Sequence, residues 1–207
     1  CSSDLALVYT EPYNDERGRN RVFPPIADFV KEKLYEDQGL HCEVAKLKMD
    51  FMTRAQSLIH GDLHTGSIFI NEESTKVFDP EFCFYGPMGY DIGNVIANMI
   101  FAWANGDAAG AADFCKWVED VLVDVINMTK EKMEKYYDEH VTDTMCRNEL
   151  YKKYYMDTII EDTSAVAGLE LIRRIVGMAN VKDITTIADE AKRARAEKIC
   201  ITAAIDF

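Results

Sequence analysis

The segment from Ser57 to Glu81 constrains the fold of this chain more than any other. It contains three short apolar runs of β type, "SLIH" (57–60), "SIFI" (67–70) and "TKVFD" (75–79). Apolar residues elsewhere recur mostly at helical spacing. The stretch "NEES" (71–74) between the second and third runs has the composition of a tight turn. These features predict a small β-hairpin embedded in a helical body.

The rest of the chain favours helices. Prolines followed by apolar residues at helical spacing predict a helix over 24–36, and similar spacing predicts another over 41–56. Residues 1–23 are expected to mix short apolar pieces with a polar loop, and 80–90 to form a loop rich in aromatic residues and glycine. Further helices are predicted over 91–106, 108–137, 143–156, 163–181 and 186–205. The predicted class is α+β, mostly α-helical.

Composition narrows the functional classes. The 207 residues suffice for one domain, or for one lobe of something larger. A net charge of −13 argues against a nucleic-acid binder, and no apolar run reaches membrane-spanning length. Six scattered cysteines without zinc-ligand spacing favour a reducing, cytoplasmic location. The chain begins at Cys1 rather than methionine, which favours a fragment.

Three acidic residues flank the predicted hairpin: Asp62 precedes it, and Asp79 and Glu81 follow it. A hairpin would bring the two ends into one pocket, as phosphoryl transfer requires, because one carboxylate accepts the proton of the attacking hydroxyl while others hold magnesium. Protein kinases place the base in an H-R-D loop, one metal ligand five residues after that base, and a second metal ligand in D-F-G. The corresponding groups here are Asp62, Ser67 and the triplet Asp79-Pro80-Glu81.

Each acid alone could be an ordinary turn residue, but the hairpin and the spacing together favour catalysis. His60 and His64 have the i, i+4 spacing of helical zinc ligands, yet Gly61 and the flanking β-type runs argue against a helix there. We expect His60 to hydrogen-bond within the loop and fix it. Asp91 is expected to head a helix, either as a capping acid or as a support for the Asp62 loop.

The stretches "LIHGDLHTGSIFI" (58–70) and "KVFDPEFCFYGPMGYDIGNVIANM" (76–99) closely resemble the methylthioribose kinase family. This family belongs to the aminoglycoside-phosphotransferase-like branch of the protein-kinase fold. Wider members of the branch typically carry Asn at the position of Ser67 and Asp at that of Glu81, so these two residues point to methylthioribose kinases. The stretches "YTEPYND" (9–15) and "LIRRIVGMANV" (171–181) are also similar, which extends the resemblance from the first residues to about position 181.

The resemblance implies transfer of the γ-phosphoryl group of ATP to the anomeric hydroxyl of 5-methylthioribose, giving the 1-phosphate in methionine salvage. It implies that Asp62 is the base and contacts the sugar, with Arg173 and Arg174 nearby. It also implies that Asp79, Pro80 and Glu81 bind ATP, and that Asp79, Glu81 and Ser67 bind Mg²⁺. A cytoplasmic homodimer is expected, without nucleic-acid or membrane partners.

The arginine pair has a second interpretation. Arg174 follows Glu170 by four residues and could form an ordinary surface ion pair on a helix. However, an apolar stripe that includes Leu169, Ile172 and Val176 lies beside the two arginines, so both need not face solvent. We therefore favour an anion or polyol site at this pair.

Two parts of a complete kinase are missing from the sequence, namely a glycine-rich loop and a β-strand lysine. We therefore expect residues 1–207 to be the C-terminal lobe of a two-lobed small-molecule kinase, without its N-terminal nucleotide-binding lobe and inactive alone. Kinases of aminoglycosides, choline or homoserine are an alternative, disfavoured by Ser67, the D-P-E triplet and the arginine pair. A non-catalytic kinase-like binding module is another, disfavoured because the loop acids are intact.

Overall fold

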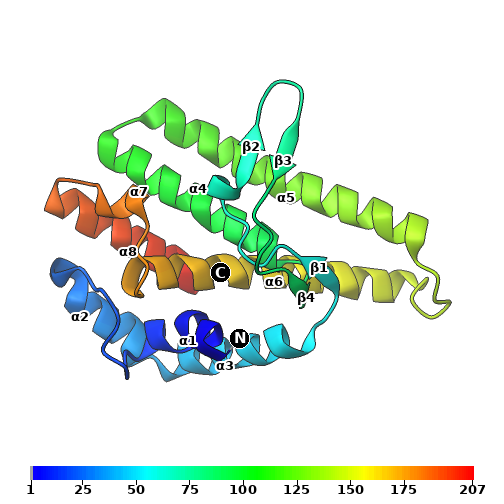
Figure 1. The fold of residues 1–207 in the computed structure, drawn as a ribbon, viewed down its shortest axis with the longest axis horizontal. Helices are drawn as coiled ribbons and strands as arrows, with labels where there is room; N and C mark the ends of the chain where they lie inside the picture. Colours follow the sequence, from blue (N-terminus) through cyan, green and yellow to red (C-terminus); the bar gives the residue numbers. More distant parts are fainter. Residues whose placement is uncertain (1) are drawn as a thin grey trace.

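Long helices run side by side and form most of the molecule in the computed structural model, which describes residues 2–207, with side chains from Leu5 onward (Figure 1). The long helices are α3 (Gln38–Thr53), α4 (Tyr90–Ala109), α5 (Ala112–His140), α6 (Glu149–Val176) and α8 (Glu190–Asp206). Shorter helices are α1 (Ser2–Tyr9), α2 (Ala27–Val30) and α7 (Lys182–Thr185). The predicted α+β, mostly helical class is confirmed.

Two small antiparallel ladders are nested within this body. The inner ladder pairs β2 (Ile68–Ile70) with β3 (Thr75–Val77), and it projects from the helices as the predicted hairpin (Figure 1). The outer ladder pairs β1 (Ser57–Ile59) with β4 (Phe84–Gly86). The prediction of a loop throughout 80–90 was therefore wrong at β4. Because "FYG" is too short to show an alternating pattern, only its partner β1 reveals it as a strand.

Predictions outside the two ladders also need correction. Residues 1–23 were expected to mix short apolar pieces with a polar loop, and the described part of this segment contains α1 and the 3₁₀ turn η1 (Glu11–Tyr13). The helices expected over 143–156 and 163–181 are one continuous helix, α6, since no proline or glycine interrupts the sequence between them. It begins after Asn148, whose side chain accepts a hydrogen bond from the backbone N–H of Leu150 at 2.8 Å.

The helix expected over 24–36 forms in three short pieces, the 3₁₀ turn η2 (Pro24–Ile26), α2 and the π-turn η3 (Lys31–Tyr35). The helix predicted over 186–205 forms as α8 and begins at Glu190, and a separate short helix, α7, precedes it. Asp189 caps α8 by accepting from the backbone N–H of Ala191 at 2.9 Å.

The close contact between α4 and α6 positions the functional residues. A Cβ atom on Gly93 of α4 would lie 2.5 Å from the carbonyl oxygen of Thr163 in α6, so only glycine allows this approach. Fully buried Ala97 and Ala167 continue the contact, and Leu171, Ile172 and Val176 of α6 enter the main core. The start of α4 and the C-terminal half of α6 are thereby held in a fixed relation. Across residues 2–207, no helix combines the length and apolar character required to cross a bilayer.

Candidate functional site

The nested ladders bring two loops together, 60–67 and 78–83, because each loop connects a strand of the outer ladder to a strand of the inner one. His60 links them directly, since its Nε2 lies 2.9 Å from the carbonyl oxygen of Phe78. A carbonyl only accepts, so Nε2 carries the proton and Nδ1 is left to accept from the backbone N–H of Asp62 at 3.4 Å. The expectation that His60 fixes the loop is confirmed.

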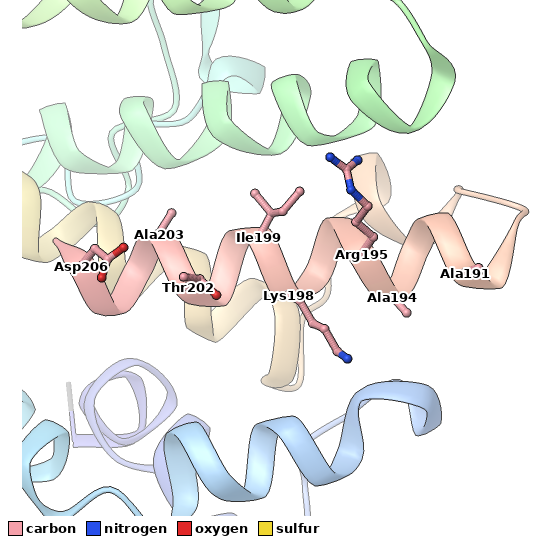
Figure 2. A pocket seen from close by; sticks show the side chains of 8 residues that line it. All are labelled: Ala191, Ala194, Arg195, Lys198, Ile199, Thr202, Ala203 and Asp206. Carbon is pink, nitrogen blue, oxygen red and sulfur yellow. The ribbon is translucent and has the colours of Figure 1, made fainter.

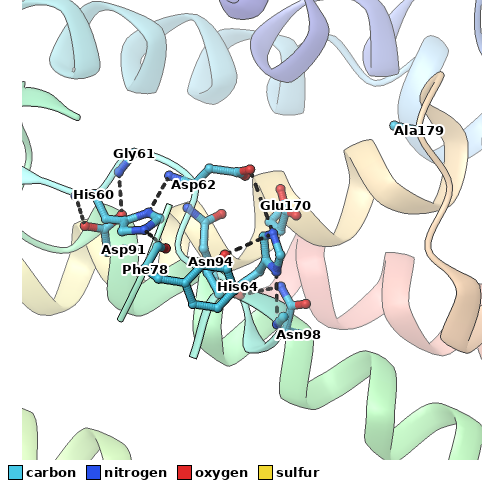
Figure 3. A network of polar contacts seen from close by, with 12 residues as sticks. His60, Gly61, Asp62, His64, Phe78, Asp91, Asn94, Asn98, Glu170 and Ala179 are labelled. Atoms are coloured by element: carbon cyan, nitrogen blue, oxygen red, sulfur yellow. Dashed lines mark hydrogen bonds and ion pairs between the residues drawn. The ribbon is translucent and has the colours of Figure 1, made fainter. Parts of the chain in front are cut away.

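Asp91, in the first turn of α4, supports the same loop. Its carboxylate accepts hydrogen bonds from the backbone N–H groups of His60 at 2.6 Å and Gly61 at 3.0 Å. Gly61 has a φ of +85°, and a Cβ atom there would lie 2.4 Å from the carbonyl oxygen of Phe82. Glycine is therefore required at this position. The predicted supporting role of Asp91 is confirmed (Figure 3).

The carboxylate of Asp62 remains available for a hydrogen bond from another molecule. One of its oxygens lies 3.7 Å from Nη2 of Arg173, and the other lies 3.9 Å from Nε2 of His64. Both distances allow electrostatic attraction but exceed those of hydrogen bonds. The side chain is 36% exposed. In Figure 3 the carboxylate extends from its loop toward His64, with Glu170 of α6 close by. This arrangement suits a general base, which must accept a proton from a bound hydroxyl.

Glu170 is the buried partner of both arginines. It is 3% exposed, its Oε2 contacts Nε of Arg173, and its Oε1 accepts from Nε of Arg174 at 2.8 Å. The ion pair considered between Glu170 and Arg174 is therefore present, but it is not a surface pair, because Glu170 is buried. The two guanidinium groups then diverge: Arg173 reaches Asp62, whereas Nη1 of Arg174 lies 3.4 Å from the carbonyl oxygen of Ala179. Burial lowers the pKa of Arg173, but the Glu170 carboxylate outweighs this effect and raises it above its usual value.

Tyr90, the first residue of α4, lies near Arg173, Glu170 and Asp62. Burial raises its pKa to about 12, with Arg173 opposing the rise and Glu170 and Asp62 adding to it. The phenol therefore stays neutral at physiological pH. Tyr90 and Gly61 also line an aromatic cavity of about 350 Å³, together with Phe82, Phe84 and Tyr85.

The D-P-E triplet lies on the second loop, with its acidic groups open to solvent. Asp79 has a φ of +67°, and the Pro80 carbonyl accepts from the Cys83 N–H at 3.1 Å to close the turn that carries Glu81. Among the described residues, Asp79 and Glu81 form no ion pair, and no three His, Cys, Asp or Glu side chains gather closely enough to hold a metal. Magnesium commonly uses one or two carboxylates plus water and phosphate oxygens, so these two carboxylates fit that ion.

Ser67 and the hairpin complete the surroundings. The Ser67 hydroxyl is buried and lies 3.2 Å from Nε2 of His64. Phe69 of β2 stacks on Phe78, next to Asp79, with ring centroids 4.4 Å apart and planes 11° from parallel. Phe69 is 65% exposed, so the pair presents an aromatic face to solvent. A separate hollow on α8, lined by residues that include Arg195, Lys198 and Asp206, contains none of the predicted site residues (Figure 2).

The Asp62 loop thus faces Arg173 of α6, and His60 links it to the loop that carries Asp79 and Glu81. The sequence profile of the phosphotransferase enzyme family matches residues 9–122, more than half of the chain. The chain belongs to this family.

Matches to individual curated proteins are more specific than the family match. The chain is 36% identical over 223 residues to methylthioribose kinase 1 of Oryza sativa subsp. japonica, 33% over 222 residues to a methylthioribose kinase of Escherichia coli, and 34% over 202 residues to one of Bacillus pumilus. These alignments cover 98–100% of this chain. The chain spans about half the length of these relatives, 50–53%.

The positions of two residues in this site, Glu170 and His64, were not predicted from the sequence. Glu170 was considered only as a partner of Arg174, and His64 only as a zinc ligand. The spacing of Glu170 three and four residues before the two arginines, beside an apolar stripe, is a signal that one carboxylate serves both. No comparable signal predicts the approach of His64 to Ser67, because it depends on the conformation of the loop.

Proposed function

We propose that this chain is the C-terminal lobe of a two-lobed ATP-dependent kinase that converts 5-methylthioribose to 5-methylthioribose 1-phosphate in methionine salvage. The single observation that carries the proposal is the open Asp62 carboxylate, which lies 3.7 Å from Nη2 of Arg173 on a loop that His60 links to the loop of Asp79 and Glu81. The identity to curated methylthioribose kinases along almost the entire chain supports the choice of substrate.

In the proposed reaction, Asp62 accepts the proton of the anomeric hydroxyl as its oxygen attacks the γ-phosphorus of ATP. A new bond forms between that oxygen and phosphorus, the bond to the bridging oxygen breaks, and ADP leaves with the electron pair. Arg173 lies beside Asp62, where a planar guanidinium group can bind both sugar hydroxyls and the transferring phosphoryl group. In the transition state, negative charge is spread over the three equatorial oxygens of the transferring phosphoryl group. A cation beside these oxygens therefore stabilises the transition state.

The nucleotide side of the site is proposed to use Asp79, Pro80 and Glu81. When bound there, Mg²⁺ neutralises charge on the phosphate oxygens. Asp79 and Glu81 would hold it directly, and Ser67 would do so only after its hydroxyl turns from His64. The exposed face of Phe69 and Phe78 next to Asp79 suits stacking of a nucleobase.

The proposal includes a cytoplasmic homodimer without nucleic-acid or membrane partners. The cysteines at 42, 83, 115, 146 and 200 are free thiols, in keeping with a reducing compartment. Sedimentation of the purified two-lobed protein at several concentrations tests the dimer.

Assays of ADP release test the proposed activity. The two-lobed protein is incubated with ATP and Mg²⁺, and with 5-methylthioribose, choline, homoserine or an aminoglycoside as acceptor. We expect rapid turnover with 5-methylthioribose alone. Preference for another acceptor would replace the substrate assignment with that of a related small-molecule kinase. Absence of turnover with every acceptor, combined with retained ligand binding, would favour a non-catalytic module.

A further inference from the structure

Glu170 lies at the centre of the charged cluster, but it faces away from solvent. It is almost completely buried in α6, at the end of the core formed by Leu169, Leu171 and Ile172. A carboxylate is costly to bury unless it is paired and hydrogen-bonded. Glu170 satisfies this requirement with two guanidinium partners, one on each oxygen.

The way in which Glu170 binds the arginines determines where their free nitrogens point. It engages Nε of Arg173 and leaves the terminal Nη2 group 3.7 Å from Asp62. It likewise engages Nε of Arg174, whose Nη1 group lies 3.4 Å from the carbonyl oxygen of Ala179. One carboxylate thus directs one guanidinium toward the reacting groups and the other toward the segment after α6.

Without Glu170, nothing comparable would hold Arg173 in this position. Its described ionic partners are Glu170 and Asp62, and the contact with Glu170 is much the shorter. A long arginine side chain carries considerable rotamer freedom. With Glu170 neutral, Arg173 would turn fully onto Asp62 and form a direct hydrogen-bonded pair, occupying the base that must receive a hydroxyl proton.

We propose that Glu170 is a positioning residue for phosphoryl transfer, which keeps Arg173 at ion-pair distance from Asp62 and thereby leaves Asp62 free to bind the acceptor hydroxyl. This inference rests on the proposed function and goes beyond it. It assigns a role to a buried residue whose carboxylate is taken up by the two arginines, and it gives Arg173 and Arg174 different tasks.

The test is Glu170→Gln in the two-lobed kinase, measured with 5-methylthioribose and ATP. The amide has the shape of the carboxylate but lacks its charge. We expect kcat/KM for the sugar to fall roughly tenfold or more, as expected when charge-assisted hydrogen bonds that hold a reacting group are weakened. The KM for ATP should stay within about twofold, since the proposed nucleotide loop is separate from α6.

Glu197→Gln is the matched control. Glu197 is also buried in a helix, at 1% exposure, and accepts from Nε of Arg193 at 2.8 Å, but it lies in α8 and outside the site. Both variants should lose thermal stability. Only Glu170→Gln should lose activity with the sugar when the two are compared at a temperature at which both are fully folded.

Two further measurements keep the inference falsifiable if Glu170→Gln folds poorly. Glu170→Asp retains the charge but withdraws it by one methylene, so it should fold and still show the loss in kcat/KM for the sugar. A double-mutant cycle with Arg173→Lys should be strongly non-additive in rate, whereas a cycle with Arg174→Lys should be nearly additive.

Wild-type rates for folded Glu170→Gln or Glu170→Asp would overturn the inference and leave the proposed function intact. Rate losses that match those of Glu197→Gln would also overturn it, because they would indicate a purely structural role. Failure of the wild-type protein to phosphorylate 5-methylthioribose would instead overturn the proposed function.

Discussion

Arg173 and Arg174 are neighbours in the sequence, but their surroundings differ. Arg173 faces Asp62, and Arg174 faces the backbone at Ala179. Lysine cannot reproduce the planar fork of arginine. We expect Arg173→Lys to lower kcat with 5-methylthioribose by about ten- to a hundredfold, the equivalent of about 1.5–3 kcal/mol for hydrogen bonds to charged groups.

The matched variant is Arg174→Lys, which shares the Glu170 partner but not the contact with Asp62. We expect it to lower stability by about 1.5–3 kcal/mol, because lysine lacks the Nε–H group that donates to the buried Glu170 carboxylate, and to leave the rate nearly unaltered. Melting temperatures and sugar-dependent rates of both variants show which of the two arginines contacts the reacting groups. Equal rate losses would mean that both arginines contact the reacting groups, and two wild-type rates would remove the pair from the site.

Asp79 and Glu81 are exposed carboxylates on one short turn, and the proposal makes them ligands of magnesium. Replacing either with alanine removes a hard oxygen donor. We expect Asp79→Ala and Glu81→Ala to reduce nucleotide affinity in the presence of Mg²⁺ and to have little effect in its absence. Calorimetric titration with and without Mg²⁺ measures this difference. Wild-type metal dependence in both variants would refute the assignment.

At the scale of residues, the sequence was most informative about groups close together along the chain. Asp62 and Asp79 were assigned from motif spacing. Asp91 was expected at the start of a helix, and its support of the Asp62 loop was found as expected. The buried state of Glu170 was not predictable in this way. It depends on the packing of α6 against α4, which brings Arg173 opposite a loop more than a hundred residues away in the sequence.

At the scale of elements, the two nested ladders explain why distant carboxylates meet. The inner hairpin was predictable from the turn "NEES" and its flanking β-type runs. The outer pairing of β1 with β4 was not, because three-residue strands show too little alternation to be separated from a loop. The continuity of α6 was likewise missed, since apolar spacing changes where the helix leaves the core.

Gly61 tests whether the conformation of the Asp62 loop matters for activity. A side chain at this position would combine a positive φ with a contact of 2.4 Å to the Phe82 carbonyl oxygen. We therefore expect Gly61→Ala to displace the loop, to cost about 1–3 kcal/mol in strain and to abolish most sugar-dependent turnover.

Gly110 provides the control, because it has a similar φ of +76° at the end of α4 but no atom within 4 Å of the place that a Cβ atom would occupy. Gly110→Ala should cost about 1–2 kcal/mol and leave kcat unaltered. Denaturation midpoints and rates measured together separate the two effects. Full activity of folded Gly61→Ala would show that the loop tolerates displacement.

At the scale of the whole molecule, buried tyrosines should make stability depend on alkaline pH. Burial raises the pKa of Tyr9 and of Tyr13, and it raises that of Tyr90 to about 12. These phenols keep their protons in the folded chain when the unfolded chain has lost them. Their stabilisation is therefore complete below the unfolded value of about 10 and declines above it, by up to about 1.4 kcal/mol per pH unit for each phenol.

Tyr13→Phe should make this decline of stability with pH shallower, because one fewer proton is released on unfolding. Replacing exposed Tyr136 with Phe should leave the slope unaltered. Urea denaturation between pH 9 and 11 measures the slopes. Identical slopes for wild type and Tyr13→Phe would mean that Tyr13 ionises equally in both states.

The most direct test of the central claim uses Asp62→Asn in the two-lobed protein. Product formation from ATP and 5-methylthioribose is followed by phosphorus NMR, and ATP binding is measured by calorimetry. We predict that the wild-type protein forms the sugar 1-phosphate and that Asp62→Asn reduces turnover by roughly 10²–10⁴-fold, the usual contribution of a general base, with ATP affinity retained. Near-normal turnover in Asp62→Asn would contradict the account, because the proton would then have to leave by another route.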